Sequence, residues 1–335
     1  MLEVKNLKTY FKTRAGYAQA VDDVTFTVNS GENFGLVGES GCGKTTAAKS
    51  IIKLLPPNGE IKGGQILYNG RDLAALSEAE MRKVRWAEVS MISQSAMNSL
   101  DPVYKVGDQI VEAIQAHQPV SRAEAMDRSR ELFKLVGIDP KRLTDYPHQF
   151  SGGMKQRSII AMALALNPGL IIADEPTTAL DVIVQDQILR RIKSLLLSHG
   201  ASMILITHDI SVVAEMCDRV AVMYAGKVME IGNVNQLFKL PFHPYTLGLQ
   251  NAFPNVHGPR QELISIPGSP PKLVNPPKGC RFAARCPFAA EVCSEQEPVM
   301  VEIEPGHQAS CHRLAIIEQM RAEATRKETW DRVGG

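Results

Sequence analysis

The sequence lacks any apolar run long enough to cross a membrane. Its longest run of this kind, at residues 159–166, is well short of the ~18–20 residues that a membrane-spanning helix needs. The N-terminal stretch carries a charge at Glu3 and has no apolar core, so no secretory signal is expected there. Any role at a membrane is therefore expected to depend on a partner protein.

The sequence also has almost no net charge. Lys and Arg together number 37 and Asp and Glu 36, which leaves a formal charge of +1. Because there is neither an overall basic balance nor a polybasic block, composition gives no argument for nucleic acid or anionic lipid as a partner. Short repeats and low-complexity segments are absent as well. The 335 residues, 44% of them hydrophobic and 22% charged, suit a globular protein with room for two domains.

Short apolar, β-branched runs alternate with helical patterns, which predicts an α/β fold built on a buried parallel sheet. Ser121 and Glu124 form a capping-box pattern at one predicted helix start. Prolines cluster in residues 265–280 and read as a semi-extended linker, and a domain boundary is expected near residue 240. The predicted strands lie within 20–37, 63–70, 170–174, 202–208 and 219–226, and the predicted helices within 45–57, 103–117 and 121–137.

A phosphate-binding loop is predicted at residues 38–46. The sequence GESGCGKTT follows a strand-like run, opens a helical pattern and fits G-x-x-x-x-G-K-[ST]. Its glycines let successive N–H groups point at phosphate oxygens, and the helix N-terminus adds partial positive charge. Lys44 is expected to reach the β- and γ-phosphates, and Thr45 to ligate Mg²⁺. The nucleotide-binding residues expected from this loop are Gly38, Ser40, Gly41, Cys42, Gly43, Lys44, Thr45 and Thr46.

Two adjacent carboxylates, Asp174 and Glu175, end the hydrophobic run at 170–174. At the C-terminal edge of a sheet, Asp174 would hold Mg²⁺ through water, and Glu175 would polarise the water that attacks the γ-phosphate. Phosphoryl transfer leaves little covalent work for a protein, so it needs positioned charge and one base. Together with the loop at 38–46, the pair predicts a nucleotide hydrolase.

Further motifs in the same order make residues 1–240 resemble the ATPase subunits of ABC transporters. The deciding stretch is FSGGMKQR at 150–157, which looks like the ABC signature motif. The Q-loop corresponds to SQ at 93–94, the D-loop to TALD at 178–181, and the switch-histidine motif to THD at 207–209. The resemblance implies a RecA-like core sheet, an antiparallel β subdomain and a helical subdomain.

This resemblance implies an ATP site shared between two ATPase subunits. Ser151, Gly152 and Gly153 would begin a helix whose N-terminal amides face the γ-phosphate of ATP bound to the other subunit. Asp181 would lie at the interface between the two subunits. Phe150 stands where the usual signature has Leu.

The resemblance also implies that Gln94 and His208 act beside Glu175 in catalysis. Gln94 would sense Mg²⁺ and the attacking water while linking to the helical subdomain, at about residues 95–165. His208 would contact the γ-phosphate and help to orient the water. Met154 replaces the usual Gln of the signature, so one polar contact to the partner's nucleotide is expected to be missing.

Tyr17 is the candidate for stacking on the adenine ring. Because its position in the stretch KTRAGYAQ does not by itself single it out, Tyr10 and Phe11 stay as alternatives.

The remainder, residues 241–335, is expected to form a C-terminal extension, and all of it except the end of the chain resembles the extension of dipeptide and oligopeptide importer ATPases. The stretches that carry this are FHPYTLGLQNAFP at 242–254, IPGSPPKL, GCRFAARCPFAAEVC and HQASCH. The resemblance implies an ATP-hydrolysing subunit, peripheral at the cytoplasmic face of the cell membrane, that powers peptide uptake. Its implied partners are a second homologous ATPase, two transmembrane permease subunits and, indirectly, an extracytoplasmic peptide-binding protein, with no nucleic acid.

Other cargoes stay open, because relatives with the same tail import nickel, glutathione or oligosaccharides. A soluble, non-transport ABC ATPase is the remote alternative. The end of the chain, HRLAIIEQMRAEATRKETW, is predicted as a plain amphipathic helix without an assigned function.

Four cysteines in this extension need a separate explanation. They are separated by five, six and seventeen residues. The Pro- and Gly-rich segment around them is too small to form its own hydrophobic core, so it needs a cross-link such as a disulfide or a bound metal. Disulfides fit poorly in a reducing compartment. Four thiolates suit zinc, although the usual tight C-x₂₋₄-C pairs are missing, and they also suit a [4Fe-4S] cluster, which tolerates wider spacing. The residues alone leave zinc, a cluster and reduced core thiols open.

The importer resemblance then implies a [4Fe-4S] cluster. Its ligands would be Cys280, Cys286, Cys293 and Cys311. If the metal were zinc instead, His307 and His312 would be substitute ligands.

Overall fold

The structure is a computed structural model, and it describes residues 1–93, 99–177, 181–252 and 263–333. The chain forms two compact units. Unit 1 comprises Met1–Val28, Phe34–Ala74 and Thr207–Gly335, and unit 2 comprises Asn29–Asn33 and Ala75–Ile206. Residues on both sides of position 240 thus belong to unit 1, and the predicted domain limits stay predictions.

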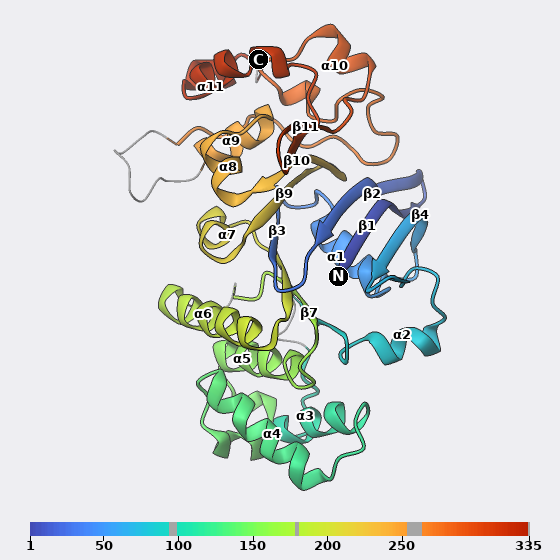
Figure 1. Cartoon of the computed structure of the whole chain (residues 1–335), viewed down its shortest axis with the longest axis vertical. Helices are drawn as coiled ribbons and strands as arrows, with labels where there is room; N and C mark the ends of the chain where they lie inside the picture. The colour runs from blue at the N-terminus through green and yellow to red at the C-terminus, as the bar shows by residue number, and fades with distance from the viewer. Residues whose placement is uncertain (94–98, 178–180, 253–262, 334–335) are drawn as a thin grey trace. The chain divides into compact units, whose positions relative to one another are not determined.

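Unit 1 contains an antiparallel sheet near the N-terminus, whose strands lie side by side in Figure 1. In its second strand Val24, Phe26 and Val28 are buried and alternate with exposed residues, as expected for a sheet with one solvated face. The strand order is β2-β1-β4-β5, with β1 at Leu2–Thr13, β2 at Gly16–Val28, β4 at Gly59–Tyr68 and β5 at Arg71–Asp72.

The other strands of unit 1 include β3, which leads into the phosphate-binding loop, and the strands that continue the sheet from it. β3 (Asn33–Val37) runs parallel to β9 (Arg219–Tyr224), and every residue of β3 is buried. β9 continues antiparallel into β10, then β12 and β11. The remaining bounds are β10 Lys227–Asn233, β11 Val301–Glu304, β12 His307–Ala309, α1 Lys44–Ile51, α7 Ile210–Met216, α8 Val234–Lys239 and α9 Pro244–Asn251.

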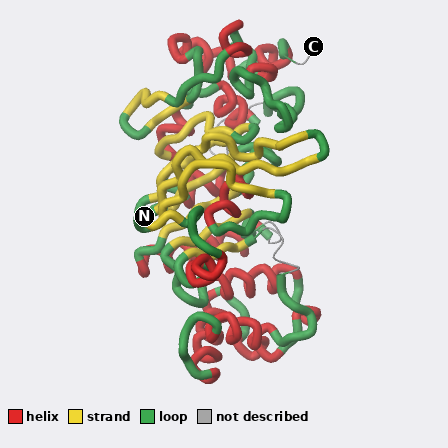
Figure 2. Tube along the Cα trace, turned by 90° about the vertical axis from the view of Figure 1, so that its right-hand side faces the viewer, coloured by secondary structure: helices red, strands yellow, loops and turns green. Residues whose placement is uncertain are grey.

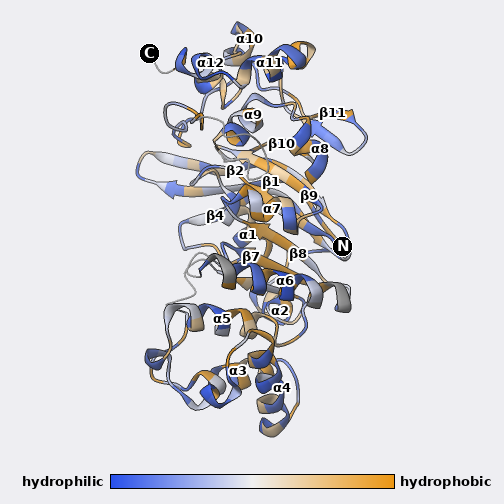
Figure 3. Ribbon diagram, turned by 90° about the vertical axis from the view of Figure 1, so that its left-hand side faces the viewer, coloured by the Kyte–Doolittle hydropathy of each residue, from blue (hydrophilic) through white to orange (hydrophobic). Residues whose placement is uncertain are grey.

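Unit 2 contains three parallel strands in the order β6-β7-β8. Figure 3 shows β7 and β8 in the colours of hydrophobic residues, and both strands are buried along their whole length. Such continuous apolar runs are typical of parallel strands covered on both faces. The bounds are β6 Val89–Ile92, β7 Leu170–Asp174, β8 Ser202–Ile206, α2 Glu78–Val84 and α6 Val182–His199.

A helical part of unit 2 precedes β7, and in Figure 2 it consists of helices and loops. The predicted capping box is confirmed, since Ser121 Oγ accepts from Glu124 N–H and the Glu124 carboxylate accepts from Ser121 N–H. Burial of Ile110, Val111 and Ile114 fixes one apolar helix face against the rest of this part. The helices are α3 (Val106–Gln115), α4 (Arg122–Leu135) and α5 (Gly152–Ala163), with 3₁₀ turns at Pro140–Thr144 and Pro147–Gln149.

The end of the chain differs from the single amphipathic helix predicted there. It forms a 3₁₀ turn, Leu314–Ile316, and two helices, α11 (Ile317–Ala324) and α12 (Lys327–Asp331). Trp330 is almost fully buried, and its indole N–H donates to the Ala324 carbonyl at 2.8 Å. This bond takes a carbonyl at the end of α11 that a longer helix would have used itself, so the prediction was wrong because it ignored tertiary packing.

The proline-rich segment at 265–280 packs against β2. Gln19 N–H donates to the Leu273 carbonyl at 2.9 Å, and Ala18 and Val274 form an antiparallel bridge. The four-cysteine region that follows contains a 3₁₀ turn, Ala283–Arg285, and the short helix α10, Glu291–Glu295.

Within the described parts of the chain, no helix combines the length and the apolar character that a membrane span requires.

Candidate nucleotide site and cysteine segment

The phosphate-binding loop joins β3 to α1 and depends on two glycines. Gly38 and Gly43 have φ angles of 147° and 107°, which L side chains rarely adopt. A Cβ atom at Gly38 would lie 2.0 Å from the Met223 carbonyl oxygen, and one at Gly43 would lie 2.2 Å from that of Ala20. The loop backbone therefore packs directly on neighbouring backbone, which leaves no room for side chains at these positions.

Lys44 begins α1, and its ammonium is held within this loop. Its Nζ donates to the carbonyl oxygens of Gly38 at 2.7 Å and Glu39 at 2.9 Å, and the residue is only 7% exposed. The loop thus keeps a positive charge beside its own backbone. Cys42 is buried next to it, and burial raises the pKa of the Cys42 thiol, so this side chain fills space as a neutral group.

His208 lies on the same cavity as the loop. Its neighbours fix the turn, because Thr207 Oγ1 accepts from Asp209 N–H at 3.1 Å and Asp209 Oδ1 accepts from Ser211 N–H at 2.9 Å. His208 itself is exposed. The cavity has a volume of about 320 Å³ and is lined by Val37, Gly38, Glu39, Ser40, His208, Ile210, Leu249, Ala252, Ser265 and Ile266. The structure therefore brings together the loop and the predicted switch histidine.

Asp174 and Glu175 lie at the C-terminal end of β7 in unit 2. Asp174 is buried. Glu175 has a φ of +48°, and its N–H donates to the Ile206 carbonyl at 2.8 Å. A left-handed conformation costs about 1–2 kcal/mol for a residue with a Cβ, and strain of this kind is often stored at functional sites. The bond to the neighbouring strand end holds Glu175 in this conformation.

Ser151 caps the N-terminus of α5. Its Oγ accepts from Met154 N–H at 3.3 Å, while Gly152 and Gly153 form the first turn with partly exposed backbone. Phe150 is 5% exposed, and its ring centroid lies 6.4 Å from that of Phe133. The Phe that replaces the usual Leu is therefore a core residue of the helical part.

Gln156 has a role that sequence reasoning missed. It is 2% exposed, and its side-chain amide donates to the Pro176 carbonyl. This bond ties the helix behind Ser151 to the turn that follows Glu175. The only signal in the sequence is a polar residue inside the motif at 150–157, and the sequence does not show what it contacts.

Asp181 and Tyr17 make their described contacts away from the phosphate-binding loop. Asp181 Oδ1 accepts from Val184 N–H at 3.0 Å and so caps α6. Tyr17 is 43% exposed, with Lys62 Nζ lying 4.6 Å from its ring centroid. Tyr10, one alternative to Tyr17, instead donates to Asp22 Oδ1 at 2.7 Å. Gln94, together with residues 178–180 of the D-loop, lies outside the described residues.

The four cysteines of the extension line one small cavity, of about 10 Å³. His312 lines it too, whereas His307 does not: its Nε2 lies 2.7 Å from Glu230 Oε1, and both side chains are fully buried. The suggestion of His307 as a metal ligand was therefore wrong. Among the described residues, no group of three or more Cys, His, Asp or Glu side chains is arranged to hold a metal ion. The cavity lining is His243, Pro244, Cys280, Phe282, Ala283, Cys286, Cys293, Cys311, His312 and Arg313.

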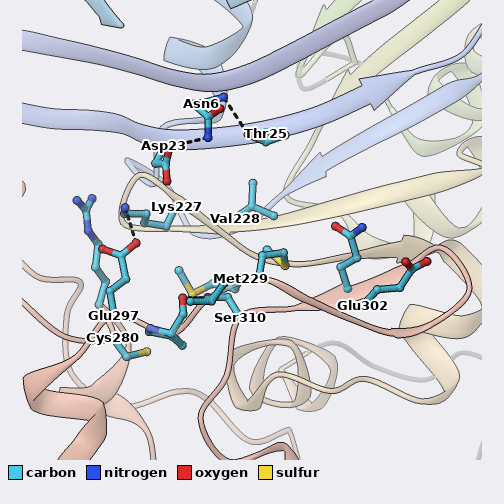
Figure 4. A pocket seen from close by; sticks show the side chains of 15 residues that line it. Asn6, Asp23, Thr25, Lys227, Val228, Met229, Cys280, Glu297, Glu302 and Ser310 are labelled. Atoms are coloured by element: carbon cyan, nitrogen blue, oxygen red, sulfur yellow. Dashed lines mark hydrogen bonds and ion pairs between the residues drawn. The ribbon is translucent and has the colours of Figure 1, made fainter. Parts of the chain in front are cut away.

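Cys280 also lines a larger cavity, of about 520 Å³, shown in Figure 4. The walls come from the strands β1 and β2, from β10, and from the segment around Glu297 and Ser310. An ion pair between Lys227 and Glu297 crosses one end. One thiol of the four-cysteine set is thus reached from two cavities.

The loop, the histidine and the carboxylate pair on this α/β scaffold define a P-loop ATPase of the ABC class. The ABC transporter family profile matches residues 21–178, and the profile described as "Oligopeptide/dipeptide transporter, C-terminal region" matches residues 229–293. A solved dimeric structure of a bacterial ABC transporter cassette, MJ0796, superposes with a TM-score of 0.65 at 28% identity, covering 70% of this chain and 99% of that one.

Curated relatives match over nearly the whole length. The chain is 52% identical over 317 residues to a probable peptide ABC transporter ATP-binding protein of Sinorhizobium fredii, covering 93% of this chain and 95% of that protein. It is 48% identical over 326 residues to the dipeptide transport ATP-binding protein DppD of Bacillus subtilis, covering 96% of each. The chain belongs to the ABC transporter family of ATP-binding proteins, in the branch with the oligopeptide/dipeptide transporter C-terminal region, and it is an ATPase of that family.

Proposed function

We propose that this chain hydrolyses ATP to power the uptake of di- or oligopeptides through partner permease subunits. The observation that carries the proposal is the pairing of two matched regions, the cassette at 21–178 and the peptide-transporter C-terminal region at 229–293. Relatives of nearly equal length are named for peptide, oligopeptide or dipeptide transport, which supports a peptide as the cargo.

The proposed reaction is ATP + water → ADP + phosphate. Lys44 and the N–H groups of the loop bind the β- and γ-phosphates, and Glu175 accepts a proton from the water whose oxygen attacks the γ-phosphorus. The bond from the γ-phosphorus to the β-phosphate oxygen breaks, and ADP leaves. His208 contacts the γ-phosphate, a role that its shared cavity with Gly38 and Ser40 supports.

A bound Mg²⁺ would offset the negative charge of the phosphates. Thr45, at the start of α1, and Asp174, at the end of β7, have the oxygen donors that this ion prefers. Gln94 is the third proposed ligand. Adenine stacking is assigned to Tyr17, the most exposed of the three candidate aromatic side chains.

The proposed assembly pairs this chain with a second, homologous ATPase subunit. The exposed N-terminus of α5, with Ser151, Gly152 and Gly153, would receive the γ-phosphate of ATP bound to the other subunit, and Asp181 would lie at the interface. A dimeric arrangement is known for the related solved cassette. Two permease subunits and an extracytoplasmic peptide-binding protein complete the proposal, with this chain peripheral at the cytoplasmic face of the cell membrane.

We further propose that the four cysteines hold a [4Fe-4S] cluster. That Cys280, Cys286, Cys293 and Cys311 line one cavity supports a shared four-thiolate group. The spacings of five, six and seventeen residues between the cysteines favour a cluster over zinc, because structural zinc sites usually have tight C-x₂₋₄-C pairs. A cluster places its thiolates around a larger body.

Transport by the assembled complex in vesicles tests the cargo. Uptake of labelled di- or oligopeptide that depends on ATP, with none of nickel, glutathione or an oligosaccharide, is the expected result. ATP-driven uptake of one of those three in place of peptide would overturn the choice of cargo and leave the ATPase intact.

Iron, sulfide and zinc content after purification without oxygen tests the cluster. About four irons and four sulfides per chain are expected, and both should be lost in Cys286→Ser. One zinc without iron, or no metal at all, would overturn the cluster.

A further inference from the structure

An arginine of the four-cysteine segment contacts the phosphate-binding loop. Arg285 immediately precedes Cys286, is 6% exposed, and places Nη1 at 2.8 Å from Glu39 Oε2. Glu39 is the second residue of the loop and lines the cavity that also contains His208. Since 246 positions separate the two partners in the chain, the pair is a tertiary connection between the C-terminal extension and the ATP site.

The guanidinium of Arg285 is fixed by further hydrogen bonds. Nε donates to the Pro267 carbonyl at 2.8 Å, Nη2 to the Ile266 carbonyl at 3.1 Å, and Nη1 to the Tyr224 hydroxyl at 3.2 Å. A planar fork held at all three nitrogens cannot change its direction without losing several bonds at once. The positive charge of Arg285 is therefore held at a fixed position beside the Glu39 carboxylate.

The backbone of Glu39 is held from the same side. Its N–H donates to the hydroxyl of Tyr245 at 2.8 Å, and Tyr245 is fully buried. The Tyr245 ring lies against Phe282, with centroids 5.3 Å apart, and Phe282 lines the cavity of the four cysteines. Carboxylate and N–H of Glu39 are thus both held by residues packed beside the cysteine segment.

The negative charge of Glu39 is the reason why this contact matters for nucleotide binding. A triphosphate brings several negative charges to the loop, and a carboxylate beside it would repel them unless a cation offsets its charge. The Glu39 side chain is 25% exposed and that of Arg285 only 7%, so solvent screens the pair incompletely. Arg285 supplies that cation and also keeps the carboxylate turned toward the extension.

We propose that Arg285 is a positioning residue for ATP binding, which neutralises and orients Glu39, so that nucleotide affinity depends on the four-cysteine segment. This inference rests on the proposed role of residues 38–46 in binding ATP. It does not depend on which metal, if any, the cysteines hold.

The test is a cycle of variants of the full chain: Arg285→Ala, Glu39→Gln and both together. MgATP affinity is measured by equilibrium titration at low and at high salt. Arg285→Ala should weaken binding about three- to tenfold, since an unpaired, partly buried carboxylate then faces the nucleotide. Glu39→Gln in the same chain should restore most of the affinity. High salt should shrink the defect of the single variant, because repulsion between charges is screened.

Arg321→Ala is the matched control. This arginine of the same extension donates to the carbonyls of Pro241 and Leu240, so its loss should leave MgATP affinity unchanged. Arg285→Lys, which keeps the charge and loses the fork, should give an intermediate affinity and provides a second variant if Arg285→Ala does not fold.

Two results would overturn the inference. The first is wild-type affinity for MgATP in both Arg285→Ala and Arg285→Lys. The second is an affinity for MgATP that is equally low in Arg285→Ala and in the double variant with Glu39→Gln. The second would mean that Arg285 supports only the fold. Failure of the wild-type chain itself to bind MgATP would instead overturn the proposed function.

Discussion

The carboxylate of Glu175 offers a sharp test of the proposed chemistry through Glu175→Gln. Gln has the same shape, so the backbone at φ +48° and its N–H bond to Ile206 should both survive. Only the ability to accept a proton is removed. A positioned general base contributes about 10²–10⁴-fold to rate, which corresponds to about 2.7–5.4 kcal/mol of activation free energy. Turnover should fall by that factor while ATP binding persists.

The assay is phosphate release by the assembled transporter, with ATP binding measured separately. Glu131→Gln is the matched control, because Glu131 is an exposed carboxylate on α4 that pairs with Arg128 at the surface. Exposed pairs of this kind contribute about 0–1 kcal/mol, so the control should hydrolyse ATP at the wild-type rate. Near wild-type turnover in Glu175→Gln would refute its assignment as the base.

Three further predictions concern the loop, the pH dependence and the C-terminus. Lys44→Ala should abolish nucleotide binding in an equilibrium titration, and unchanged affinity would contradict its role at the phosphates. Burial and the hydrogen bond to Asp22 raise the pKa of Tyr10 to about 12, so its contribution to stability is complete below pH 10 and is lost as the pH rises toward 12. Denaturant unfolding across that range should show a flatter decline in Tyr10→Phe, and an unchanged slope would count against the shifted pKa. Trp330→Ala should lower the free energy of unfolding by about 3–5 kcal/mol, as for other buried aromatic side chains; an unaltered unfolding midpoint would mean that α12 does not contribute to the core.

Local patterns in the sequence determined the features whose causes are local. The glycines and Lys44 of the phosphate-binding loop can be recognised because the required backbone conformation and charge belong to consecutive residues. The same holds for the capping box of Ser121 and Glu124, where both partners lie within one helical turn. The strand at 170–174 was predicted with its observed bounds because a fully buried parallel strand is a continuous apolar run.

Contacts between distant segments were decided only by the tertiary structure. Nothing near Glu39 in the sequence indicates Arg285, and nothing near Glu230 indicates that His307 pairs with it rather than with a metal. Trp330 likewise breaks a helix that its local pattern favours, because its indole finds a buried acceptor at Ala324. Side-chain periodicity reports which face of an element is buried but not which residue it meets there. The sequence therefore determined the chemistry of the phosphate-binding loop, and only the fold determined that the cysteine segment contacts it.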